Sequence, residues 1–124
     1  MDLIFKINDK EDADKLAVLL YKEINSQRIN GLIDIELLRG DETKHSMGLG
    51  KYIPEIKCNI DAKLSLEPIS KLFDTLSVFI NLFKRKETTI EIYKKDGDKL
   101  KKVSIMTTEL KKEQILELIN ETLK

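Results

Sequence analysis

Five short segments of the chain alternate apolar and polar residues, a pattern that predicts β-strands with one buried face. They cover residues 2–7, 32–37, 56–60, 88–93 and 100–105. In the second segment the alternation assigns Ile33, Ile35 and Leu37 to the buried face. The last two segments flank an Asp-Gly turn signal, which predicts a hairpin. A change of phase between residues 100 and 103 predicts either a bulge or an early turn.

Three further segments place apolar residues three and four positions apart, the spacing of an amphipathic helix. Helices are expected over residues 11–27, from Ser65 to the basic run at 84–86, and over residues 111–123. The middle segment holds three of the four phenylalanines, so this helix is expected to be the central element of the core. The last helix is expected to bury one stripe made of Ile115, Leu116, Ile119 and Leu123.

The predicted elements follow the order β-α-β-β-α-β-β-α, which indicates an α+β fold. A sheet with its helices mainly on one face would bury every apolar stripe, so a two-layer sandwich is predicted. The chain contains no internal repeat, low-complexity tract or linker, and residues 1–124 are therefore interpreted as a single α+β domain. The order of the strands within the sheet does not follow from the sequence.

Charge and composition narrow the classes of partner. The 124 residues contain 22 Lys and Arg against 22 Asp and Glu, so the net charge is zero, which argues against nucleic acid as the partner. No segment has the roughly 18–20 apolar residues of a membrane span, and the start lacks a signal-peptide pattern. Because the single cysteine, Cys58, cannot form an internal disulfide, the cytoplasm is the expected compartment.

The residues that usually carry chemistry do not form a recognisable constellation. His45 beside Ser46, with Cys58 nearby in sequence, lacks an orienting third group, and one histidine with one cysteine is too few for zinc. The Gly-Leu-Gly-Lys run at 48–51 departs from a phosphate-binding loop, because histidine occupies its first glycine position and tyrosine replaces the final Ser or Thr. We therefore predict no catalytic residue, cofactor or metal.

The even charge balance hides an asymmetry along the chain. Residues 1–50 contain seven bases and ten acids, whereas residues 51–124 contain fifteen bases and twelve acids. Within the second part, residues 84–102 hold eight bases and four acids. This segment is either a patch for RNA, DNA or an acidic partner, or a hairpin whose lysines guard the edge of the sheet, and we favour the second interpretation.

Five residues are the candidates for contact with a protein partner. Met47, Gly48 and Leu49 belong to a glycine-bearing segment at 39–52, which is predicted to be a long surface loop. Val78 and Leu82 fall beside the main apolar stripe of the middle helix. Either these two side chains form an exposed apolar surface, or the helix has a wide face that is simply core.

Residues 28–106 also resemble a known family. The matching features, in chain order, are Arg-Ile-Asn-Gly-Leu-Ile at 28–33, Met-Gly at 47–48, the apolar helix through 76–83 with its basic end at 84–86, and the strand and turn at 89–97. Together they are similar to the effector-associated constant component family of bacterial conflict systems. The resemblance implies a non-enzymatic adaptor that connects a sensor or an NTPase-driven module to an effector.

The leading hypothesis is thus a cytoplasmic adaptor domain with a protein partner, either an effector or a sensor module, and no cofactor. The alternative is an immunity protein or antitoxin that binds and blocks a partner protein. The uneven charge distribution leaves a homo-oligomer open, because two dipolar copies attract head to tail.

Overall fold

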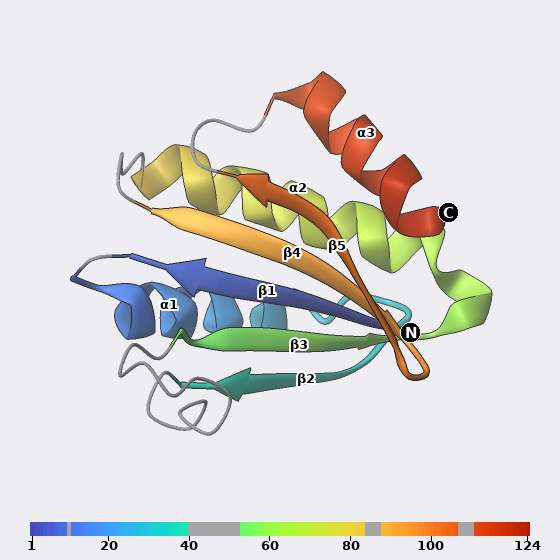
Figure 1. The fold of residues 1–124 in the computed structure, drawn as a ribbon, viewed down its shortest axis with the longest axis horizontal. Coiled ribbons are helices and arrows are strands. Elements are labelled where there is room, and N and C mark those ends of the chain that lie inside the picture. The colour runs from blue at the N-terminus through green and yellow to red at the C-terminus, as the bar shows by residue number, and fades with distance from the viewer. Residues whose placement is uncertain (10, 40–52, 84–87, 107–110) are drawn as a thin grey trace.

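In the computed structural model, which describes residues 1–9, 11–39, 53–83, 88–106 and 111–124, five strands form one antiparallel sheet (Figure 1). The strands are β1 (Asp2–Asn8), β2 (Leu32–Leu38), β3 (Glu55–Ile60), β4 (Thr89–Asp96) and β5 (Lys99–Met106). Their order across the sheet is β2-β3-β1-β4-β5. The first strand of the chain therefore lies at the centre, while β2 and β5 form the two edges.

Two helices cover one face of this sheet and a third packs beside them (Figure 1). They are α1 (Ala13–Ser26), α2 (Leu66–Phe83) and α3 (Lys112–Leu123), with a short 3₁₀ helix, η2 (Ala62–Leu64), before α2. Helix α3 contacts both α2 and β5. The α+β sandwich is confirmed, and its element order differs from the predicted one only by η2. No helix in the described ranges is long and apolar enough to span a bilayer.

The core forms where the inner face of the sheet meets α1 and α2. Alternate residues of the central strand β1 and of its neighbours β3 and β4 point inward. These inward residues are all buried: Leu3, Phe5, Ile7, Ile56, Cys58, Ile60, Ile90 and Ile92. The ring of Phe5 meets the ring of Phe73 on α2 edge to face, with centroids 6.3 Å apart and planes at 82°. The prediction that the middle helix is a central core element is confirmed.

The predicted buried face of β2 is wrong in part. A bulge between Leu32 and Asp34 interrupts the pairing of β2 with β3. Because an extra residue shifts the alternation by one, Leu32 faces the core while Ile33 is 67% exposed. Beyond the bulge, Ile35 and Leu37 pack against the core as predicted.

The predicted stripe of α3 is also wrong in part. Ile119 is buried and Ile115 partly so, but Leu116 and Leu123 are exposed, and Leu118 and Thr122 are buried in their place. The Thr122 hydroxyl donates a hydrogen bond of 2.7 Å to the carbonyl oxygen of Leu118, which satisfies the polar group inside the core.

The bulge expected in the last strand is confirmed. Tyr93 pairs with Lys102 and Ile92 pairs with Ser104, which leaves Val103 as the extra residue.

Candidate interaction surface

The outer face of α2 carries two exposed apolar side chains, Val78 and Leu82. Val78 is 58% exposed. Leu82 is 74% exposed, the highest value among the large apolar residues in the described part of the chain. The two residues are one helical turn apart, so their side chains are neighbours on the helix surface. We call this pair the α2 patch. Its exposure excludes the interpretation that the wide face of this helix is simply core.

The helical spacing of α2 explains why these two residues point outward. Its inward stripe consists of five buried apolar residues, Ile69, Leu72, Phe73, Leu76 and Phe79. Val78 lies on the side of the helix opposite that stripe, with Leu82 a turn further on. Polar residues also occupy this outer side and are exposed: Lys71, Asp74 and Asn81. The α2 patch is therefore a small apolar surface bordered by polar side chains.

The other predicted contact residues, Met47, Gly48 and Leu49, lie outside the described residues, and so do His45 and Ser46. The structure therefore places only two of the five candidates, and it places them side by side on one helix.

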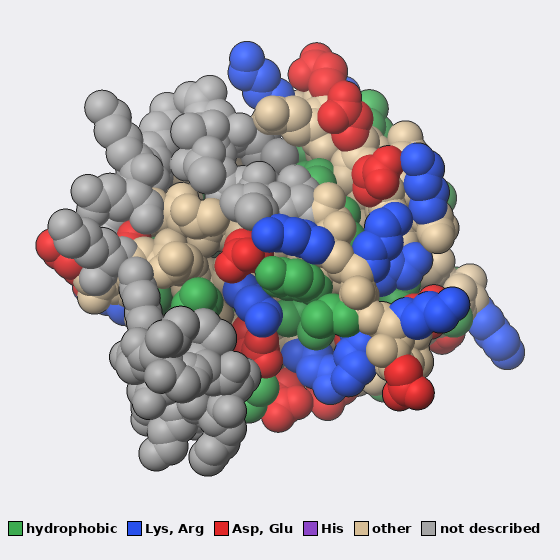
Figure 2. All heavy atoms as spheres, in the orientation of Figure 1, with side chains coloured by type: hydrophobic (Ala, Val, Ile, Leu, Met, Phe, Trp, Pro, Cys, Tyr) green, Lys and Arg blue, Asp and Glu red, His purple; other side chains and the backbone are tan. Residues whose placement is uncertain are grey.

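The sheet face turned away from the helices carries charged residues around an apolar centre. Figure 2, which looks onto this face, shows a small group of hydrophobic side chains surrounded by lysines and acidic residues. Ile4 and Tyr93, cross-strand partners on β1 and β4, belong to this face. The Tyr93 hydroxyl donates a hydrogen bond to Glu91 at 3.0 Å, and the Lys6 ammonium lies 4.9 Å from the centre of the Tyr93 ring.

Six charged side chains on this open sheet face pair with one another. Ion pairs join neighbouring strands: Lys57 with Asp2 at 3.7 Å, Lys6 with Glu55 at 3.9 Å and Lys102 with Glu91 at 3.4 Å. Burial, followed by the hydrogen bond to Glu91 and the charge of that carboxylate, raises the pKa of Tyr93. The tyrosine is therefore uncharged at neutral pH. The charged groups in these three pairs leave little unsatisfied charge to attract a ligand at the centre of this face.

The single cysteine is unsuited to nucleophilic chemistry. Burial, with a smaller contribution from the charge of Asp2, raises the pKa of the Cys58 thiol to about 12. The reactive thiolate is therefore scarce at neutral pH. Cys58 instead packs as a small hydrophobic residue in the core, on the same face of β3 as Ile56 and Ile60.

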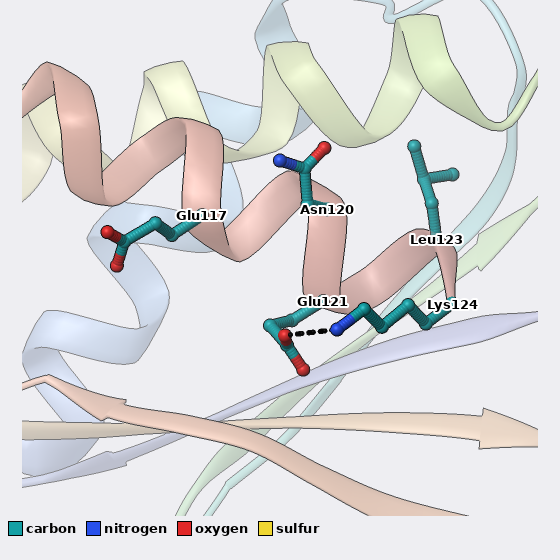
Figure 3. A pocket seen from close by; sticks show the side chains of 5 residues that line it. All are labelled: Glu117, Asn120, Glu121, Leu123 and Lys124. Carbon is teal, nitrogen blue, oxygen red and sulfur yellow. Dashed lines mark hydrogen bonds and ion pairs between the residues drawn. The ribbon is translucent and has the colours of Figure 1, made fainter.

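An open hollow of about 670 Å³ lies beside the C-terminal half of α3, lined by Glu117, Asn120, Glu121, Leu123 and Lys124 (Figure 3). Figure 3 shows Glu121 pointing toward Lys124, whose ammonium donates a hydrogen bond of 3.0 Å to the Glu121 carboxylate. Asn120 and Leu123 project from the other side of the helix. The hydrogen bond and the charge of Lys124 lower the pKa of Glu121, so this carboxyl is ionised at neutral pH. One of the two acids that line the hollow is thus paired with a base from the same helix turn.

No group of three metal-ligating side chains occurs within the described ranges. Sequence reasoning missed one feature, the exposed acidic residues of the edge strand β2, because the position of that strand in the sheet was not predictable.

The chain matches no protein-family model, no curated protein and no solved structure. The resemblance to the effector-associated constant component family therefore stays a prediction.

Proposed function

We propose that this chain is a non-enzymatic adaptor domain that binds a protein partner through the α2 patch. The observation that carries the proposal is the exposure of Val78 and Leu82 side by side on the outer face of a helix whose inner face is buried. Apolar neighbours bordered by polar residues are typical of a protein-binding surface. The resemblance described above supports the same role and favours an effector or sensor module as the partner.

The size of the α2 patch indicates what it contributes to binding. Burying a leucine or valine side chain contributes about 1.5–3 kcal/mol, so these two residues together reach the range of an interface hot spot. The polar residues around them would stay partly solvated at the rim. A partner with an apolar groove that accepts neighbouring side chains of one helix would fit this geometry.

The direct test is site-specific photo-cross-linking in the cells that encode the protein, at its natural abundance. A photoreactive amino acid replaces Val78 in one variant and Lys22, an exposed residue of α1, in a matched control. We expect one discrete adduct from position 78 and none from position 22. The adduct should disappear when Leu82→Asp is added. Since Leu82 is exposed but lies in the last turn of α2, where aspartate is unfavourable, this substitution should lower the free energy of unfolding by about 1 kcal/mol or less.

Two outcomes would contradict the proposal: no adduct at position 78, or an adduct that survives Leu82→Asp in a protein shown by thermal unfolding to be folded. The identity of the adduct decides between the two hypotheses drawn from the sequence. An effector or sensor protein favours the adaptor, whereas a toxin favours an immunity protein or antitoxin.

A further inference from the structure

The two edge strands of the sheet, β5 and β2, differ in their lysine content, which affects whether another strand can pair with them. Among its first four residues, β5 has three lysines, Lys99, Lys101 and Lys102, and lysines on an edge strand discourage pairing with another strand. The other edge, β2, has the sequence Leu-Ile-Asp-Ile-Glu-Leu-Leu and contains no lysine. On its side away from β3, β2 has no strand partner in the part of the chain that the structure describes.

We propose that the free edge of β2 binds an extended segment of a protein partner in which Lys or Arg alternate with apolar residues. The segment would add a sixth strand to the sheet, with backbone hydrogen bonds to β2. This surface lies on a different element from the α2 patch and rests on different observations. Either surface can therefore fail without the other.

The alternation of β2 sets the chemistry of the partner. Asp34 and Glu36 are exposed on the open sheet face, and within the described ranges neither takes part in an ion pair. The alternate residues Ile35 and Leu37 are half-buried on the helix-facing side. Because cross-strand neighbours lie about 5 Å apart, a partner strand would place basic residues beside the two acids and apolar residues beside the other two.

Exposed apolar side chains at the start of β2 add a second point of contact. Ile33 projects from the bulge and is 67% exposed. Leu64 of η2 is also exposed, and its β-carbon lies close to Gly31, immediately before β2. An apolar residue at one end of the partner segment would be partly buried there.

Charge also argues against a second copy of this chain pairing its own β2 with this edge. Antiparallel pairing of two β2 strands about a two-fold axis places the exposed acids Asp34 and Glu36 of both copies close together, and like charges across strands are destabilising. The same acids that oppose self-pairing favour a basic partner. Charge complementarity therefore selects a foreign basic strand at this edge.

The test is a selection from a cysteine-free library of random twelve-residue peptides displayed on phage, with the whole chain as target. Clones that also bind the double variant Asp34→Lys/Glu36→Lys are removed. We expect enriched peptides with alternating apolar and basic residues. Each should bind D34K/E36K about tenfold more weakly and D34N/E36Q with intermediate strength. A proline in the middle of the peptide should abolish binding, because proline removes a backbone donor and cannot continue the ladder.

Amide chemical-shift changes should map the bound peptide to β2 and leave β5 unaffected, and Leu82→Asp should leave binding unchanged. Failure of the photo-cross-link at Val78 would therefore not affect this result. The proposal is overturned if no peptide is enriched, if the proline peptide binds equally well, or if the shifts map elsewhere. It is also overturned if the chain alone self-associates with rising concentration and D34K/E36K abolishes that association, since the occupant is then a second copy.

Discussion

Gly31 packs directly against Pro68: a β-carbon at position 31 would lie 2.9 Å from Cγ of the proline ring. Gly31 also adopts a φ of 90°, which residues with a side chain rarely adopt. The contact fixes the start of β2 against the first turn of α2. It thereby ties the edge strand to the helix that carries the α2 patch.

Replacing Gly31 should be costly for this reason. We expect Gly31→Ala to lower the free energy of unfolding by about 2 kcal/mol or more, since it combines backbone strain with a steric clash. Gly97→Ala is the matched control, because Gly97 also has a positive φ, 62°, but nothing lies within 4 Å of the added β-carbon. The control should cost only about 1 kcal/mol. Equal losses in urea-induced unfolding would contradict the steric account.

The bulge in β2 predicts different outcomes for two isoleucines two residues apart. Ile33→Thr should change the free energy of unfolding by less than about 0.5 kcal/mol, because the Ile33 side chain is exposed. Ile35→Thr should cost about 1–2 kcal/mol, because it places a hydroxyl against the core. Thermal unfolding of both variants measures the difference. The reverse order would show that the strand pairs with β3 without a bulge.

Asp9 links the start of α1 to the start of β4. Its Oδ1 accepts hydrogen bonds from the backbone amides of Glu11 and Asp12, and its Oδ2 accepts one from the Thr88 hydroxyl. Since Asp9 is buried, Asp9→Ala should cost about 2–3 kcal/mol in urea unfolding. Asp61→Ala is the control, because it removes one exposed cap to Lys63 and should cost about 1 kcal/mol or less. Similar losses for the two variants would argue against the buried network.

The buried thiol predicts an alkaline loss of stability. The pKa of Cys58 is raised from 9.0 to about 12 by burial, so between these pH values the unfolded chain releases a proton that the folded chain keeps. Stability that is fully present below pH 9 is therefore lost as the pH rises, by about 1.4 kcal/mol per pH unit.

The measurement compares urea unfolding at pH 8 and pH 10.5 for the wild type and Cys58→Ala. The wild type should lose about 2 kcal/mol more than the variant over this interval. Tyr93, whose pKa is also raised, weakens both proteins in the same direction and cancels in the comparison. Equal losses would mean that the thiol ionises without unfolding.

The sequence predicted the parts of the fold that depend on local periodicity. The positions of all five strands and three helices followed from apolar spacing, as did the central place of α2 in the core. It could not predict the order of the strands, which depends on contacts between distant segments. That order makes β2 an edge, and this position is what makes Asp34 and Glu36 available to a partner.

Two stripes predicted from the sequence failed for identifiable reasons. In β2, one inserted residue moved Ile33 to the outside. In α3, apolar residues occur on two overlapping stripes, and packing against α2 and β5 selected the one with Leu118 rather than Leu116. In α2, the predicted place of Val78 is beside the stripe, but the side chain lies on the opposite side of the helix, which no element in the described ranges covers.

The central claim is that the α2 patch binds a protein partner. The most direct test measures the dissociation constant of the partner identified by cross-linking for two matched variants of this chain. Leu82→Asp changes the α2 patch, whereas Leu116→Asp makes the same change at an exposed leucine of α3. We predict that Leu82→Asp raises the dissociation constant by about tenfold or more and that Leu116→Asp changes it by less than about twofold. Equal affinities of the two variants for the partner would contradict the account.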